Sequence, residues 1–191
     1  MKKHMIILLA IASVFALALC LAGCGKSGAP EPATTDNGTA NTSANMANPW
    51  AEYDSADAAA KAAGVGTFKT PVGTEGRLGK IDPAWAKYRA MDGVAEVQFP
   101  AGAYEMQARK GLASAATDGD ISGDYNTYKA QWTAKVGSTD VKCFGQADGA
   151  ARKVIWTSGD YCYSLVVAPS GDADDLGLNA EDVAFFVNNI K

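Results

Sequence analysis

Residue types on which many enzymes depend are scarce in this 191-residue chain. It has one histidine, His4, at the extreme N-terminus. Without a histidine in the body of the chain, a Ser-His-Asp or Cys-His nucleophile is excluded, and the side chain best suited to proton transfer near neutral pH is missing. No glycine-rich phosphate loop with a following lysine is present either. We therefore expect a protein that is not an enzyme and that needs no cofactor.

Positive charge is also limited. The 17 Lys and Arg residues stand against 21 Asp and Glu residues, which gives a formal net charge of -4 and a pI near 5.0. Such a chain is poorly suited to neutralise phosphates, so we expect no nucleic-acid partner. The four cysteines and one histidine do not form the cluster that zinc needs. With 48% hydrophobic residues, the composition is nevertheless that of a folded protein.

The N-terminus has the pattern of an export signal. Residues 1–4 are a short basic start, and residues 5–19 are an uncharged apolar run. The run ends in Leu21-Ala22-Gly23-Cys24. These four residues resemble the bacterial lipobox, which is a Leu, two small residues and then the Cys that receives the lipid. The sequence thus predicts a bacterial lipoprotein.

The lipobox resemblance implies a signal peptide over residues 1–23, cleavage between Gly23 and Cys24, and acylation of the Cys24 thiol. Cys20 is the competing site, but the bulky Leu19 precedes it. An uncleaved transmembrane anchor is the alternative, because residues 5–22 are just long enough to span a bilayer. Both interpretations place the rest of the chain outside the cytoplasm, under oxidising conditions. We expect a lipid-anchored protein at the cell membrane that faces the extracytoplasmic side.

Residues 24–47 are predicted to be the lipidated cysteine followed by a disordered tether. The stretch 25–45 contains no large apolar residue, so it cannot offset the entropy of its own ordering. A flexible coil of this length reaches about 25–30 Å. The tether would therefore hold the following domain clear of the lipid head groups.

Residues 48–191 are predicted to form a single globular domain. An extended entry strand at 48–53 leads into an Ala-rich helix at 56–63, and a second helix at 180–190 closes the chain behind Asn179. Between the helices the apolar pattern has period two, with Gly-containing turns that are typical of hairpins. The expected strands are 81–91, 94–99, 103–110, 125–136, 140–146, 151–157 and 161–168.

This order of elements predicts the α+β class. We expect a curved antiparallel sheet of about seven strands in meander order, with the N-terminal and the C-terminal helix packed on one face. Short hairpin connections exclude a parallel βαβ core, and with it a nucleotide-binding Rossmann unit. Four Trp residues and the other aromatics supply the bulk of a core. A ligand groove lined by some of them is the alternative interpretation.

One loop has a partial calcium-binding pattern. Asp118, Asp120 and Ser122 alternate, Gly123 follows, and Asp124 comes next, which places oxygen ligands and a bend where a calcium loop has them. The closing position, however, is Lys129 where such loops have a bidentate Glu. We favour a connection that uses Asp, Ser and Gly for its turns, with no metal bound. Calcium binding by the oxygens of Asp118, Asp120, Ser122 and Asp124 is the alternative.

Cys143 and Cys162 remain in the exported part of the chain. Exported proteins seldom keep two free thiols, which favours a disulfide. In a simple meander, however, the two cysteines lie on strands that flank a common neighbour, about 10 Å apart, whereas a bridge needs less than about 7 Å. A disulfide and two buried, inert thiols both stay open as interpretations.

The domain also contains motifs of a familiar kind. They are Asn48-Pro49-Trp50-Ala51-Glu52-Tyr53, the Ala-Ala-Lys-Ala-Ala-Gly at 59–64, Ile121-Ser122-Gly123-Asp124-Tyr125, and Trp156-Thr157-Ser158-Gly159-Asp160-Tyr161-Cys162-Tyr163-Ser164. Together they resemble an uncharacterised bacterial lipoprotein family, whose members carry a domain of unknown function behind a signal and a tether. The resemblance covers about residues 48–191 and implies no particular activity.

These observations predict a non-enzymatic lipoprotein that binds a protein or another component of the cell envelope. The membrane is its expected partner through Cys24. The alternative is a solute- or lipid-binding lipoprotein with a pocket between sheet and helices, for which a cavity of several hundred cubic ångströms would be required.

Overall fold

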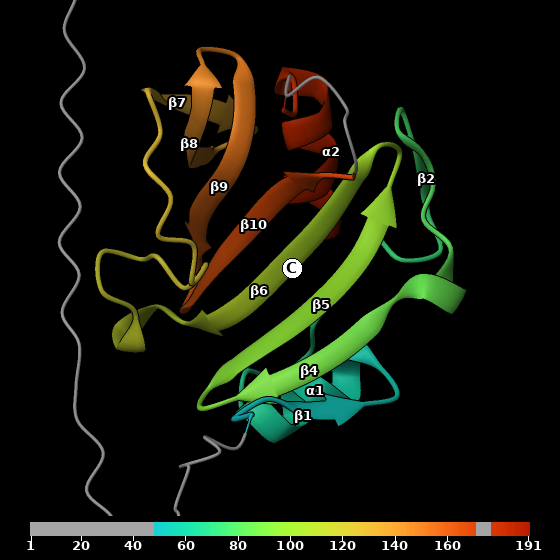
Figure 1. The fold of residues 1–191 in the computed structure, drawn as a ribbon. Coiled ribbons are helices and arrows are strands. Elements are labelled where there is room, and N and C mark those ends of the chain that lie inside the picture. Colours follow the sequence, from blue (N-terminus) through green and yellow to red (C-terminus); the bar gives the residue numbers. More distant parts are fainter. Residues whose placement is uncertain (1–47, 171–176) are drawn as a thin grey trace, which may run out of the picture. The chain divides into compact units, whose positions relative to one another are not determined.

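The computed structural model describes residues 48–170 and 177–191. The predicted signal peptide, Cys24 and the predicted tether lie outside the described residues. One antiparallel sheet of eight strands dominates the rest, in the order β1-β4-β5-β6-β10-β9-β8-β7 (Figure 1). Its strands are β1 (Ala51–Tyr53), β4 (Lys87–Met91), β5 (Val94–Ala101), β6 (Tyr104–Leu112), β7 (Ala130–Val136), β8 (Thr139–Ala147), β9 (Ala150–Ser158) and β10 (Tyr161–Pro169).

The sheet consists of two meanders, β4-β5-β6 and β7-β8-β9-β10, together with the edge strand β1 beside β4. Tight glycine-containing turns link the strands within each meander; in the β4–β5 turn, Asp92 and Gly93 both have positive φ, which matches the right-handed twist of a hairpin. The meanders join because β6 pairs with β10. Residues 113–129 then carry the chain from the centre of the sheet to its far edge at β7. The predicted single meander is therefore wrong at this one connection.

The α+β class and the antiparallel sheet are as predicted, but the sheet has eight strands instead of about seven. The eighth strand is β1, which lies within the entry strand predicted at 48–53 and joins the sheet by pairing with β4. The predicted strand 81–91 begins only at Lys87, because Pro83 starts a 3₁₀ turn, η1 (Pro83–Trp85), and cannot donate to a ladder. A separate small hairpin, β2 (Glu75–Gly76) and β3 (Gly79–Lys80), was not predicted.

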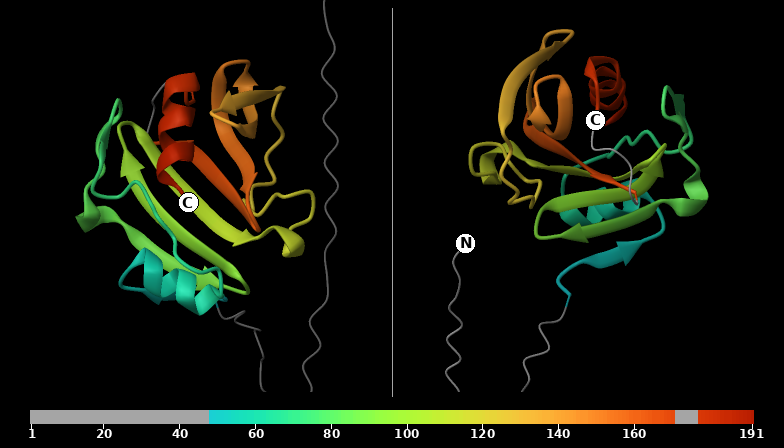
Figure 2. Two further views of the ribbon diagram at one scale, coloured as in Figure 1. Left: turned by 180° about the vertical axis from the view of Figure 1, so that it is seen from behind. Right: turned by 45° about the horizontal axis from the view of Figure 1, so that its top comes forward.

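Two helices lie on the same face of the sheet (Figure 2). The Ser55 side chain caps α1 (Ala56–Ala63), and Gly64 ends it with φ of 70°. The Asn179 side chain caps α2 (Ala180–Asn189). Their positions differ from the prediction in that they cover separate parts of this face: α1 packs on β4 and β5, whereas α2 packs on β7 and β9. No helix in the described part of the chain is long and apolar enough to cross a membrane.

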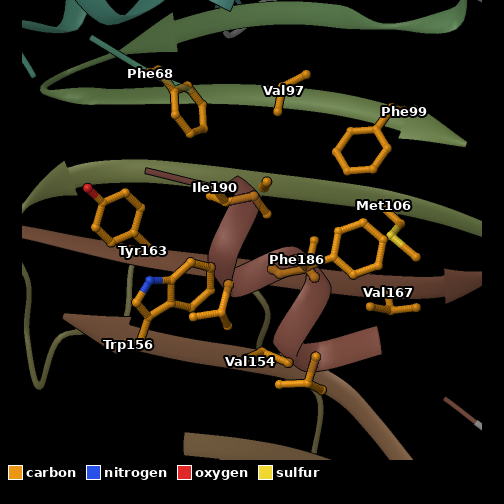
Figure 3. Packing of buried hydrophobic residues seen from close by; sticks show 14 of the residues in the cluster. Phe68, Val97, Phe99, Met106, Val154, Trp156, Tyr163, Val167, Phe186 and Ile190 are labelled. Carbon is orange, nitrogen blue, oxygen red and sulfur yellow. The ribbon is translucent and has the colours of Figure 1, made fainter. Parts of the chain in front are cut away.

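The hydrophobic core lies between this face and the two helices (Figure 3). Phe186 of α2 contacts Phe99 of β5, with their ring centroids 6.2 Å apart. Phe68, from the segment that follows α1, also enters this core. That segment is held by a backbone pair between Lys69 and the C-terminal Lys191. The helix-covered face is thus closed by apolar packing, and each buried aromatic ring contributes about 1.5–3 kcal/mol of stability.

Candidate functional site

The opposite face of the sheet carries most of the unusual polar chemistry. Residues 113–129, which we call the strap, lie against it and begin with η2 (Ala113–Ala115). Three side chains of the sheet donate hydrogen bonds to backbone oxygens of the strap: Gln107 to Ser122 (3.1 Å), Arg109 to Ile121 (3.0 Å) and Lys153 to Asp124 (3.4 Å). The strap has little secondary structure of its own, so side chains of the sheet hold it in place.

A buried carboxylate lies at the centre of this face. Strand register aligns Arg89, Glu96 and Arg109 in one row across β4, β5 and β6. The Glu96 side chain is fully buried. Arg89 Nε donates to Glu96 Oε1 at 2.8 Å, and Arg109 Nε donates to Glu96 Oε2 at 2.8 Å. Because each carboxylate oxygen meets a guanidinium, the buried charge is compensated on both sides.

The same two guanidiniums hold the start of the domain. Arg89 and Arg109 lie over the Trp50 ring, with their central carbons 5.0 and 4.8 Å from its centroid. Trp50 comes just before β1. Arg109 therefore connects the first residues of the domain, the buried carboxylate of Glu96 and the strap.

Gly123 allows the strap to approach Arg109 closely. Its φ is +64°, a conformation that glycine adopts without strain. A Cβ atom at this position would lie 2.4 Å from Arg109 Nη1. Glycine is thus required here for both the backbone conformation and the contact.

A lysine, Lys153, also lies beneath the strap. Its ammonium is 4.7 Å from the centroid of Phe144, and it donates to Asp120 Oδ2 at 3.1 Å. Burial works to raise the pKa of Asp120, but hydrogen bonds from Ser122 and the charge of Lys153 outweigh it, so this pKa lies below its ordinary value. Asp120 is therefore ionised near neutral pH, and its ion pair with Lys153 holds the strap against the sheet.

Most side-chain oxygens of the candidate calcium loop accept hydrogen bonds from other groups of the protein. Asp120 accepts from the Ser122 backbone (2.8 Å) and from Lys153, while Ser122 Oγ accepts from the Asp124 backbone (3.1 Å). The Asp124 carboxylate accepts from Tyr128 and Asn126, and Asp118 lies apart from this network. Within residues 48–170 and 177–191, no three His, Cys, Asp or Glu side chains are grouped so that they could hold a metal ion.

An open depression of about 520 Å³ lies beside the strap. Ile155 of β9 and the strap residues Asp118 and Gly119 are among its lining residues. The remaining lining is Ser138, Thr139, Asp140, Lys142, Trp156, Thr157 and Ser158. The volume falls within the range of small-molecule sites, and the lining offers hydroxyl, carboxylate and ammonium groups. The depression can accept a polar partner group.

The helix-covered face has much less room. A cavity of about 150 Å³ lies between the sheet and the end of α2, and Trp156, Tyr163 and Ile190 are among its lining residues. This is the place where the aromatic groove predicted as an alternative would lie. Sites for small molecules typically measure about 300–1,000 Å³, so this cavity is too small for most solutes or for a lipid chain.

Cys143 and Cys162 are both buried and free. Cys143 pairs with Val154 on the helix-covered face, whereas Cys162 pairs with Thr157 and faces the strap. The two thiols therefore lie on opposite sides of the sheet, in addition to being separated by β9. Burial raises the pKa of Cys143 to about 11 and raises that of Cys162 as well, which leaves both thiols protonated and unreactive near neutral pH.

Sequence reasoning did not find Glu96, Arg109 and Lys153. Each lies at a polar position of an alternating strand, where a solvated side chain is the ordinary expectation. The available signal in the sequence was the length of the polar connection at 113–129, since the other strands are joined by short turns. A connection of this length could have indicated that the chain crosses a face of the sheet. No family model, no curated protein and no solved structure matches the chain. The resemblance to a lipoprotein family stays a prediction.

Proposed function

We propose that this protein is a non-enzymatic lipoprotein, held at the extracytoplasmic side of the cell membrane through Cys24, whose domain binds a protein or another envelope component. The single observation that carries the proposal is the Leu21-Ala22-Gly23-Cys24 motif at the end of the apolar N-terminal run. One acyl chain binds a bilayer only marginally, whereas two give stable anchoring.

The chemistry of the domain supports a binding role. No histidine occurs after His4, and both thiols in the described residues are buried and protonated. The charged groups buried on the polar face, such as Glu96 and Arg109, bond to one another and not to open space. The open depression beside the strap offers hydroxyl, carboxylate and ammonium groups to a polar partner.

The alternative is a solute- or lipid-binding lipoprotein with its pocket between sheet and helices. The cavity of about 150 Å³ at that place speaks against it, since most ligands of that kind need more than twice this volume. We therefore favour the envelope-binding role.

The anchor is tested with the full chain and its Cys24→Ser variant in a bacterial host that processes lipoproteins. Metabolic labelling with a fatty acid should mark the unchanged protein in the membrane fraction, and the variant should lose the label. Cys20→Ser is the matched control and should keep it. Equal label in the Cys24→Ser variant and the unchanged protein would contradict the proposal.

The binding face is tested by cross-linking in intact membranes, followed by purification. Lys142→Glu reverses a charge in the depression, whereas Lys61→Glu makes the same change on exposed α1, away from that face. A partner of the depression should be lost from the first variant and kept by the second. If both variants capture the same set of partners, the depression is not the binding surface.

A further inference from the structure

The two edges of the sheet are unequal. On one side the sheet ends in β1, which has three residues, and on the other in β7, which has seven. Proteins usually protect long edge strands with proline, a bulge or inward-pointing charges, because a free edge invites another strand. β7 contains no proline, and the register irregularities lie between β8 and β9. In the described part of the chain, β8 is its sole paired neighbour.

The free backbone groups of β7 follow from its hairpin. A two-residue turn, Gly137-Ser138, joins Val136 to Thr139. In such a hairpin the residues that flank the turn bond to each other, and bonded pairs then alternate along the ladder. The N–H and C=O groups of Gln131, Thr133 and Lys135 therefore point away from β8, toward the open edge.

The side chains of β7 do not oppose pairing with another strand. The one charged residue, Lys135, is neutralised by Asp140 of β8 at 2.7 Å. Gln131 and Thr133 are polar and uncharged. On the helix-covered side, Trp132 and Ala134 are only half-buried, so an added strand would cover apolar surface that the monomer leaves partly open.

We infer that two copies of this chain pair through β7, antiparallel and centred on Thr133. In this register all seven residues are paired: Thr133 lies opposite Thr133 of the second copy, and Gln131 lies opposite Lys135. No like charges meet. The three outward-facing residues of each copy then exchange about six backbone hydrogen bonds across the twofold axis.

Self-association is favoured over capture of an unrelated peptide for two reasons. First, in the antiparallel register each Lys135 lies opposite the uncharged Gln131 of the second copy, so the strand can pair with itself without charge repulsion. Second, anchoring at a membrane, if the proposed function holds, concentrates copies of the chain on one surface. The inference itself does not require the anchor, so it can fail or succeed separately from the proposed function.

Cysteine cross-linking of the full chain in membranes tests the register. Residues that exchange backbone bonds have Cα atoms about 5.5 Å apart, within the range of a disulfide. Thr133→Cys should therefore form a covalent dimer on a non-reducing gel under mild oxidation. Gln131→Cys is the matched control: Gln131 is also exposed on the same strand, but the two copies of residue 131 lie about 14 Å apart. It should stay monomeric, and the double variant Gln131→Cys, Lys135→Cys should cross-link again.

A second pair of variants separates pairing from folding, measured by sedimentation of the full chain in detergent. Thr133→Pro removes one outward N–H and no bond to β8, so the fold should persist while the dimer is lost. Thr133→Val keeps the N–H and should leave the dimer unchanged. Gln131→Lys should weaken it about threefold to tenfold through two like-charge contacts, and Gln131→Glu should strengthen it by a similar factor. Monomers at every concentration, or dimers that tolerate Thr133→Pro, would overturn the inference.

Discussion

The two faces of the sheet are closed by different forces. On one face, two helices bury an apolar layer in which Phe99 and Phe186 are fully enclosed. On the other, the strap is held by hydrogen bonds from Gln107, Arg109 and Lys153, and the fully buried Glu96 compensates the charge of Arg109. The first closure depends on shape and area. The second depends on charge and on hydrogen bonds that must all be present together.

This difference has consequences for stability and for function. Apolar packing is insensitive to pH and to salt, and it tolerates substitutions that keep volume. A buried polar network stabilises little relative to a well-packed apolar equivalent, yet removing one member leaves another charge buried without a partner. We therefore expect the helix-covered face to respond to changes of volume and the strapped face to changes of charge.

The largest effect is expected on the helix-covered face. Phe186→Ala should lower the free energy of unfolding by about 3–5 kcal/mol, because it leaves a cavity where the ring meets Phe99. Tyr125→Ala is the control: its side chain is 95% exposed on the strap, so its loss should change stability by less than about 0.5 kcal/mol. Chemical denaturation measures both. A similar small loss for the two variants would show that α2 does not close this face.

On the strapped face, Glu96→Gln should lower the free energy of unfolding by about 3 kcal/mol, since the amide leaves two guanidiniums without a counter-charge. Glu52→Gln removes a carboxylate from the same row of the sheet at an exposed position, and it should cost less than about 0.5 kcal/mol. The same denaturation experiment applies. If the two variants behave alike, the network around Glu96 contributes nothing beyond surface charge.

The strapped face should also depend on pH. The folded state lowers the pKa of Asp120, so this residue stabilises the protein above its unfolded pKa of about 3.9, and the contribution is lost as the pH falls through the lower folded value. The difference in unfolding free energy between the unchanged protein and Asp120→Asn should therefore be constant near pH 6 and shrink below about pH 4. A difference that stays constant to pH 2 would contradict this.

The smallest effect is expected at Ser164. Its hydroxyl is fully buried on the strapped face and, within the described residues, has no hydrogen-bond partner. Ser164→Ala removes a desolvated polar group, so it should leave stability unchanged or raise it by up to about 1 kcal/mol. Thermal unfolding can detect a change of that size. A clear loss of stability would mean that the hydroxyl has a partner after all, such as an ordered water.

Much of the fold was predictable from local pattern. The helix at 56–63 followed from the Ser55 cap and the Gly64 stop, and the hairpins followed from turn residues such as Asp92-Gly93. These signals act over a few residues and do not depend on the rest of the chain. The number of strands was less certain, because the pairing of β1 with β4 joins segments more than thirty residues apart, and no local pattern reports such a pair.

The candidate site was far less predictable. The pattern at Asp118–Asp124 suggested a possible cation site, and the structure engages Asp120 with the ammonium of Lys153, thirty-three residues away. Strand register alone decides that Arg89 and Arg109 flank Glu96, and it also decides that Cys143 and Cys162 lie on opposite faces. A shift of one residue in any of these strands would reverse the side on which its side chains lie.

The sequence by itself determined the antiparallel α+β class and the positions of most turns, and it predicts the export address. Each of these rests on short runs of residues whose hydropathy, size or backbone preference is sufficient. Only the tertiary structure decided that the meander breaks after β6, that residues 113–129 lie across the polar face, and that β7 is a long edge strand among the described residues. Those outcomes depend on which distant strands pair, and pairing reflects the packing of the whole sheet and not the preference of any one segment.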